Sequence, residues 1–126
     1  MFHTNMKKII IDLDGTLTNA DTKDYRNVSP RLDVIKRLIS FKELGYYVII
    51  HTARNMNSFN CNIGKINIHT IPVITEWLDK HGVPYDEIIV GKPWCGTDGF
   101  YVDDKAIRPD EFVTLSENEI SKLINF

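Results

Sequence analysis

Short apolar segments that stop at charged or hydroxyl residues constrain the fold of this chain more than any other feature. The first, residues 8–13 (KIIIDL), is expected to be a strand buried on both faces, as in a parallel sheet. Similar segments at residues 46–51, 86–90 and 99–103 predict three further strands. A short fifth strand near 112–115 is an additional candidate.

Helical patterns lie between these strands. A first helix is predicted over residues 29–45, where Ser-Pro supplies the start and Gly the end. A second is predicted over residues 70–82, and a capping box at residues 116–119 predicts a C-terminal helix. Residues 55–69 contain five Asn and are expected to be irregular. The alternation of strands and helices predicts the α/β class, with helices on the faces of a parallel sheet.

Length, net charge and cysteine content restrict the class of protein to which this chain can belong. A chain of 126 residues has the length of one domain, so we expect a single domain over residues 1–126. The net charge of −2 disfavours a nucleic-acid partner bound mainly through phosphate attraction. The cysteines Cys61 and Cys95 are too few for a disulfide scaffold or a four-thiolate zinc site. Because no apolar run approaches the ~20 residues of a membrane helix, we expect a cytoplasmic protein without a membrane partner.

Polar side chains stand where each predicted strand ends. In chain order they are Asp12, Asp14, Thr52, Arg54, Lys92, Asp103 and Asp104. The carboxyl ends of parallel strands meet at one edge of a sheet, where ligands bind. Carboxylates are ligands of Mg²⁺, while ammonium, guanidinium and hydroxyl groups bind phosphate oxygens. The sequence therefore predicts a site for a hard divalent cation and a phosphoryl group.

These residues resemble the motifs of a known family. Residues 9–17 (IIIDLDGTL) look like the first motif of the haloacid dehalogenase superfamily of phosphohydrolases. Thr52 matches its second motif, Lys92 its third and Asp103-Asp104 its fourth, in family order. The resemblance implies a three-layer Rossmann-like sandwich with a mostly parallel sheet and no separate cap domain.

The resemblance also implies catalytic roles. Asp12 is the nucleophile, which attacks phosphorus and forms an aspartyl-phosphate. Asp14 is the general acid for the leaving oxygen and then the general base for the hydrolytic water. Thr52 and Lys92 hold the phosphoryl oxygens.

A magnesium site is implied by the same motifs. Asp103 is expected to bind Mg²⁺ together with Asp12 and the backbone carbonyl of Asp14, and Asp104 to assist directly or through water. The chain is thus expected to be a Mg²⁺-dependent phosphatase, a hydrolase of phosphoric monoesters.

Substrate choice depends on a narrower resemblance. Residues 91–94 (GKPW) and 99–105 (GFYVDDK) look like small phosphatases linked to capsule and surface-polysaccharide synthesis, so a sugar phosphate is the expected small-molecule substrate. Two alternatives stay open. One is a phosphatase for a macromolecular end, such as a nucleic-acid 3′-phosphate or a phosphoprotein. The other is a Mg²⁺/phosphate-binding module without turnover.

The spacing between the motif residues indicates how the site is closed over a substrate. The intervals between Asp12, Thr52 and Lys92 hold no cap domain, so loops or a neighbouring subunit of a homo-oligomer would serve as the lid. Residues 15–28, with Thr18, Tyr25 and Arg26, and the Asn-rich residues 55–67 are the candidate lids. Only eleven residues separate Lys92 from Asp103, so we expect an extended loop over 91–99 rather than a crossover helix.

Three further residues are candidates for contact with the substrate. Arg54 would pair with a substrate anion, the alternative being an ordinary surface charge. Asn55 belongs to the amide-rich loop, whose side chains suit a hydroxyl-rich ligand or act only as turn formers. Trp94 would form an apolar wall, the alternative being core packing.

Overall fold

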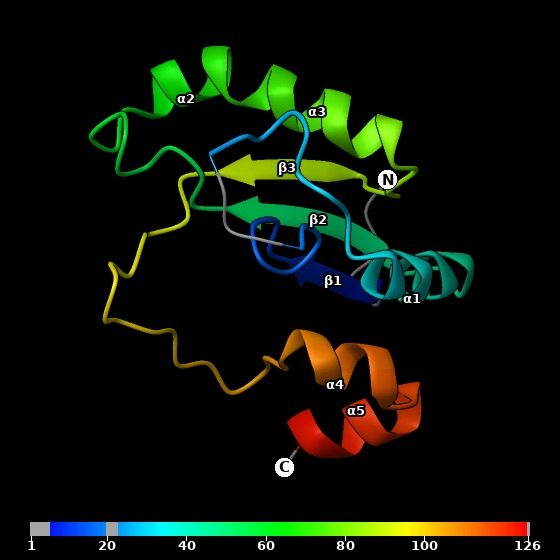
Figure 1. Ribbon diagram of the computed structural model, residues 1–126. Coiled ribbons are helices and arrows are strands. Elements are labelled where there is room, and N and C mark those ends of the chain that lie inside the picture. The colour runs from blue at the N-terminus through cyan, green and yellow to red at the C-terminus, as the bar shows by residue number, and fades with distance from the viewer. Residues whose placement is uncertain (1–5, 20–22, 126) are drawn as a thin grey trace. The chain divides into compact units, whose positions relative to one another are not determined.

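The computed structural model of the chain describes residues 6–19 and 23–125 (Figure 1). The chain divides into two compact units, a first that ends at Trp94 and a second that begins at Cys95. Each is described by itself below. The expectation of one domain over residues 1–126 stays a prediction.

The first unit contains a parallel sheet of three strands. These are β1 (Lys8–Ile11), β2 (Tyr47–Thr52) and β3 (Glu87–Val90), in the order β1-β2-β3. In the ladder Ile11 lies beside Ile50, which lies beside Ile88, so the three strands end at nearly the same level. The predicted α/β class and parallel sheet are confirmed, and the first three strands agree with prediction to within about two residues at each end.

Three helices belong to this unit: α1 (Leu32–Glu43), α2 (Ile63–His69) and α3 (Ile71–Lys80). Right-handed crossovers in a sheet of this order place all of them over the same face. The buried side chains agree, because the apolar stripes of α1 and α3 and one face of the strands form the core. Its members include Ile11, Val34, Leu38, Val48, Ile50, Ile74, Trp77 and Leu78.

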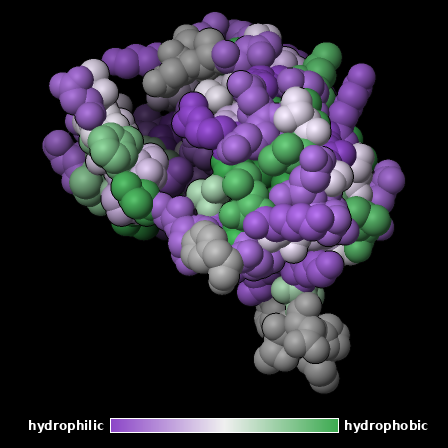
Figure 2. Space-filling model, turned by 90° about the horizontal axis from the view of Figure 1, so that it is seen from below, coloured by the Kyte–Doolittle hydropathy of each residue, from purple (hydrophilic) through white to green (hydrophobic). Residues whose placement is uncertain are grey.

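The opposite face of the sheet is more exposed. Ile10 on β1 is 65% exposed and Ile89 on β3 is 43% exposed. The prediction that the first strand is buried on both faces is therefore wrong. The reason is that α1 and α3 cover only the face that carries Ile11. Figure 2 colours the residues by hydropathy and shows hydrophobic residues (green) interspersed among hydrophilic ones (purple) on the surface that it draws.

Helix α1 begins two residues later than predicted, because the chain before it bonds to another segment. Its N-cap is Arg31 rather than Ser29. The Asn19 N–H donates to the Ser29 carbonyl at 2.8 Å, and the Arg31 N–H donates to the Leu17 carbonyl at 2.8 Å. These bonds hold residues 29–31 extended and tie the start of α1 to the loop that follows β1.

Helix α2 was not expected, since residues 55–69 were predicted to be irregular. The irregular part ends at Asn62, whose side-chain oxygen accepts a hydrogen bond from the Lys65 N–H at 3.1 Å and caps the helix. The prediction holds for residues 55–62 and is wrong for 63–69. A single Asn cap followed by a short apolar pattern is a weak helix signal, and it was hidden among the other asparagines.

The second unit is helical. It contains α4 (Pro109–Thr114) and α5 (Glu117–Ile124). The predicted C-terminal helix is confirmed, because the Ser116 hydroxyl accepts from the Glu119 N–H at 3.1 Å and the Glu119 carboxylate accepts from the Ser116 N–H at 3.0 Å. No helix in the described part of the chain is long and apolar enough to cross a membrane.

Two predicted strands in this unit are wrong. Residues 112–115 belong to α4 and its end, where Pro109 starts the helix and Phe112 is buried. Residues 99–103 form no strand, although their alternation fits one. A strand is defined by a bonded neighbour, and a local sequence pattern cannot supply that neighbour.

Candidate active site

Asp12 follows β1 directly and begins a tight turn. The carbonyl of Leu13 accepts hydrogen bonds from the N–H groups of Thr16, Leu17 and Thr18 at 2.9–3.2 Å. Gly15 has a φ of 79°, which suits glycine. The Thr16 hydroxyl donates to Asp12 Oδ2 at 3.4 Å. The turn thus holds the Asp12 carboxylate at the carboxyl end of the sheet, with 35% of its side chain exposed.

Lys92 faces this carboxylate. Its Nζ lies 3.6 Å from Asp12 Oδ1, although the two residues are far apart in the sequence. Burial raises the pKa of the Asp12 carboxyl, and the Lys92 ammonium opposes that rise. The two predicted residues are therefore brought together as expected for a nucleophile beside a phosphate-binding cation.

Thr52 ends β2 between these residues in the sheet. Its side chain is buried, and its Oγ1 accepts a hydrogen bond from the Arg54 N–H at 3.0 Å. Its carbonyl accepts from the Lys92 N–H at 3.2 Å, so the loops after β2 and β3 leave the sheet side by side. A hydroxyl that accepts one bond still has its own hydrogen to donate to a phosphoryl oxygen.

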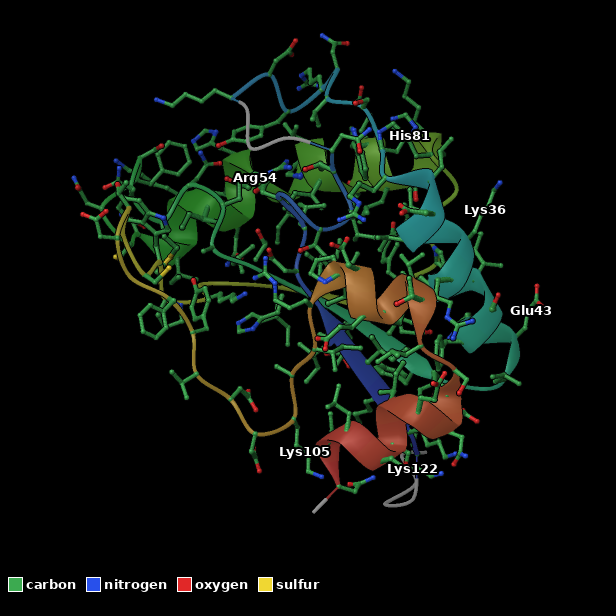
Figure 3. The ribbon with its side chains drawn as sticks, turned by 60° about the horizontal axis from the view of Figure 1, so that its bottom comes forward. Lys36, Glu43, Arg54, His81, Lys105 and Lys122 are labelled. Carbon is green, nitrogen blue, oxygen red and sulfur yellow. The ribbon has the colours of Figure 1, made fainter. Side chains whose placement is uncertain are left out.

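Arg54 and Asp14 form a buried, two-bond pair. Arg54 Nε donates to Asp14 Oδ2 at 3.1 Å, and Nη2 donates to Oδ1 at 2.8 Å. The Tyr25 ring lies against the guanidinium, with its centroid 4.0 Å from Cζ. Arg54 is only 4% exposed, so the alternative of an ordinary surface charge is wrong (Figure 3). The pairing with Asp14 was missed from the sequence, where the two residues are forty positions apart.

One atom of this pair has no hydrogen-bond partner among residues 6–19 and 23–125. It is Arg54 Nη1, which is buried. A buried guanidinium nitrogen in that condition is costly, and an anionic ligand oxygen would satisfy it. The expected role of Arg54 toward a substrate anion stays a prediction that this atom supports.

His51 lies on β2, next to Thr52. Burial lowers the pKa of His51, and the Lys92 ammonium lowers it further.

Asp103 and Asp104 belong to the second unit, where both are exposed and Asp103 Oδ1 accepts from the Lys105 N–H at 2.8 Å. Their predicted role as metal ligands is untested and stays a prediction.

The donor set of the first unit fits a hard cation. Within residues 6–19 and 23–125, no three His, Cys, Asp or Glu side chains gather to hold a metal ion. Mg²⁺ needs fewer protein ligands than that, because it keeps several waters and binds through one or two carboxylates and substrate phosphates. The partly exposed Asp12 carboxylate and the adjacent backbone carbonyls are ligands of the right type.

The loop after β2 also forms one wall of a cavity. Asn55 has a φ of 63°, and its side-chain oxygen accepts from the Thr70 hydroxyl at 2.6 Å, which anchors the loop to the start of α3. Trp94 is 49% exposed, so the alternative of core packing is wrong. The cavity has a volume of about 340 Å³ and is lined by Met56, Asn57, Asn60, Cys61, Pro93 and Trp94.

Four of these lining residues belong to the Asn-rich segment 55–67, which was predicted as a candidate lid, and Trp94 was a predicted substrate contact. The sequence did not single out Met56, Cys61 or Pro93 individually, although each follows closely on Arg54 or Lys92. In the other candidate lid, Tyr25 contacts Arg54, Thr18 is buried, and Arg26 pairs at 2.6 Å with Glu76 on α3. Residues 20–22 of that lid lie outside the described residues.

Known proteins resemble this chain in sequence and in structure. The sequence pattern of the haloacid dehalogenase-like hydrolases matches residues 9–77, more than half of the chain. A crystal structure of a Vibrio cholerae protein is 65% identical, with a TM-score of 0.92 over 94% of this chain and 97% of that one. No curated protein matches the chain.

Two weaker similarities are to chains in structures of the Pnkp1/Rnl/Hen1 complex, one of them described as an RNA repair complex. They are 23% and 24% identical, each with a TM-score of 0.49, and cover 70% and 81% of this chain but 27% and 32% of those. These similarities are too low to support an inference about function.

The chain belongs to the haloacid dehalogenase-like hydrolase family, as its turn around Asp12 and its parallel sheet indicate. Its fold is the α/β fold of that family.

Proposed function

We propose that this hydrolase is a Mg²⁺-dependent phosphomonoesterase that works through an aspartyl-phosphate. One observation carries the proposal: the Asp12 carboxylate lies 3.6 Å from the Lys92 ammonium at the carboxyl end of the sheet. A nucleophilic carboxylate beside a fixed cation is the arrangement that phosphoryl transfer requires, because the cation stabilises the charge of the transferred group.

The reaction has two steps. In the first, an Asp12 oxygen forms a bond to phosphorus, the ester P–O bond breaks, and the leaving oxygen takes a proton from Asp14. In the second, water attacks the aspartyl-phosphate while Asp14 accepts a proton from it. The bond between the Asp12 oxygen and phosphorus then breaks, and inorganic phosphate leaves. Thr52 and Lys92 hold the phosphoryl oxygens in both steps.

The pair between Arg54 and Asp14 supports the second step. A two-bond guanidinium contact is made by an ionised carboxylate, which is the form of Asp14 that accepts a proton. In the first step Asp14 must carry a proton, so its contact with Arg54 has to lengthen. The unsatisfied Nη1 of Arg54 offers the substrate phosphate a competing contact.

Asp12, the backbone carbonyl of Asp14, Asp103 and Asp104 are the proposed Mg²⁺ ligands. When bound, the cation would offset the charge of the phosphoryl group and of the carboxylates around it. We also propose that Asp103 and Asp104 are supplied by a second copy of the chain, so that a homo-oligomer completes the site.

Two features support the second copy. The sheet order leaves one edge of β1 without a neighbouring strand in the described part of the chain. A parallel crossover in the same chain normally takes a dozen or more residues, and only residues 91–98 lie between β3 and the segment at 99–103. Short connections of this kind favour exchange of segments between copies.

The proposed substrate is a sugar phosphate of capsule or surface-polysaccharide synthesis. A macromolecular phosphate end and a binding module without turnover remain the alternatives. We place the protein in the cytoplasm, which its unpaired cysteines, Cys61 and Cys95, favour. Nucleic acid and membrane are not proposed as partners.

Phosphate release from a panel of sugar phosphates, nucleotides, an aryl phosphate and acetyl phosphate tests the proposal, with Mg²⁺ and with EDTA. We expect turnover that requires Mg²⁺ and falls by at least about 10³-fold in Asp12→Asn. Turnover that survives this substitution would exclude the mechanism. Mg²⁺ binding without turnover of any substrate would favour the binding module.

A further inference from the structure

The cavity beside the site continues from the residues that would hold the phosphate. One wall, residues 56–61, follows Thr52 and Arg54, and the other, Pro93 and Trp94, follows Lys92. The hydrogen bond from the Lys92 N–H to the Thr52 carbonyl joins the bases of these two walls. The cavity therefore adjoins the residues that would hold a phosphate ester, and it can receive the leaving group of that ester.

The first wall is a rigid loop. The Cys61 N–H donates to the Met56 carbonyl at 2.8 Å, and the Phe59 N–H donates to the Asn55 carbonyl at 2.9 Å. Asn55, Asn60 and Cys61 have φ values of 63°, 50° and 61°. Residues other than glycine adopt this conformation at a cost, and it persists only where the surroundings enforce it. The cavity wall is thus formed before a ligand arrives.

The chemistry of the lining indicates the ligand class. None of the six lining side chains is an acid or a base of the Asp, Glu, Lys, Arg or His type. Met56, Pro93 and the half-exposed Trp94 offer apolar surface, whereas Asn57 and Asn60 carry amides that both donate and accept hydrogen bonds. An uncharged ring with hydroxyl groups has both kinds of surface, since its C–H face is apolar and its edge is polar.

We propose that this cavity binds the sugar ring of a sugar phosphate, with Trp94 against the apolar face of the ring and the amides of Asn57 and Asn60 on its hydroxyls. The inference deepens the proposed phosphatase function and rests on it. The volume of about 340 Å³ lies at the lower end of the ~300–1,000 Å³ range of small-molecule sites, which suits one monosaccharide better than a polymer.

Steady-state kinetics of Trp94→Ala and of the double variant Asn57→Ala/Asn60→Ala test the proposal in the full chain. The substrates are a panel of hexose 1- and 6-phosphates, and acetyl phosphate is the probe whose leaving group is too small to reach the cavity. For the hexose phosphates that the wild type hydrolyses, we expect kcat/KM to fall about 10- to 100-fold through KM. For acetyl phosphate we expect kcat/KM to stay within about twofold.

Trp94→Phe should restore most of the hexose phosphate activity, and Asn118→Ala, an exposed asparagine on α5, is the matched control. Equal losses with all substrates, or no loss with any, would overturn the sugar site. These results differ from failure of the proposed function, in which the wild type would not hydrolyse acetyl phosphate or the hexose phosphates.

A binding measurement gives a second readout. Trp77 is buried in the core and Trp94 is half exposed, so sugar binding should change only the fluorescence of Trp94. We expect a saturable change when the best hexose phosphate is added to Asp12→Asn, and its loss in Asp12→Asn/Trp94→Phe. A change that survives in the double variant would contradict the assigned position of the ring.

Discussion

Arg54 is held on two sides within the buried part of the site. The Asp14 carboxylate accepts hydrogen bonds from two of its nitrogens, and the Tyr25 ring lies over the face of its guanidinium. A guanidinium fixed in this way orients Asp14 more strictly than a lysine ammonium would, because two parallel bonds define a plane. In the proposed mechanism, Arg54 is thus a positioning residue for Asp14, the proposed general acid and base.

Substitutions of Arg54 should distinguish the effect of its positive charge on kcat from the effect of its two-bond geometry. We expect kcat to fall about 10-fold in Arg54→Lys, which keeps the charge, and at least about 100-fold in Arg54→Ala. Acetyl phosphate kinetics, together with thermal unfolding to detect loss of fold, provide the measurement. A lysine variant with wild-type kcat would show that only the positive charge matters.

The control is Arg37→Ala. Arg37 lies on α1, where its guanidinium is over the Phe41 ring at 5.2 Å, and its loss should leave kcat within about twofold.

At the residue scale, the sequence predicted that Asp12 and Lys92 lie at the same edge of the sheet, and the structure places them 3.6 Å apart. The string around Asp12 is a local motif, and Lys92 follows a strand in the expected order. The pair of Arg54 and Asp14 and the cavity lining depend on where loops fold in space, which no local pattern records.

At the scale of elements, Asp86 lies just before β3 and connects this strand to a helix and to a second strand. Its Oδ2 accepts from Lys42 Nζ on α1 at 2.6 Å and from the Val48 N–H on β2 at 2.8 Å. Burial tends to raise the pKa of Asp86, but these two hydrogen bonds outweigh burial and hold the pKa below its usual value of 3.8. One carboxylate therefore links α1, β2 and β3.

Asp86→Asn should destabilise the fold in a pH-dependent way. We expect a loss of about 1 kcal/mol in the free energy of unfolding at neutral pH, because the charged bond to Lys42 is lost. A lowered folded pKa stabilises the fold above the unfolded value of 3.8, and this contribution disappears as the pH falls below it. The difference between variant and wild type in urea unfolding should therefore vanish toward acid pH.

Glu43→Gln provides the comparison at the exposed end of α1, where Figure 3 labels the residue. It should change the free energy of unfolding by less than about 0.5 kcal/mol at neutral pH. A difference for Asp86→Asn that persisted at acid pH would contradict the ionic origin of its effect.

Helices and strands could be predicted where the sequence pattern that specifies them lies within the element itself. The strands β1, β2 and β3 were found because each is a short apolar run, and α5 was found because its capping box is complete. Helix α2 was missed because a single Asn cap starts it. The strand predicted at 99–103 failed because pairing is a property of two segments.

At the scale of the whole molecule, a site shared between two copies predicts the activity of a mixture of two inactive variants. Asp12→Asn and Asp103→Asn should each be nearly inactive alone. Co-refolded in equal amounts, they should recover about one quarter of wild-type activity. Half of the dimers would be mixed, and each mixed dimer would contain one site with both wild-type carboxylates.

Recovery is measured as phosphate release, with light scattering to establish the dimer. If Asp12 and Asp103 of one chain serve the same site, every site in the mixture lacks one of them and activity stays at the level of the single variants. That outcome would remove the second copy from the proposal and leave the phosphatase mechanism intact. The sequence alone suggested a neighbouring subunit only through the missing cap domain, whereas the short connection after Lys92 predicted an extended loop.

The hydrogen bond between the Lys92 N–H and the Thr52 carbonyl has a consequence for how such a protein diversifies. It is made by the main chain, so every side chain at these two positions keeps it, except a proline at position 92, which has no N–H to donate. The backbone at the two proposed phosphate-binding positions is therefore held in place independently of side chains, while the residues just beyond them can vary. A descendant of this protein could acquire a new substrate by changes within residues 56–61 and 93–94, with its chemistry undisturbed.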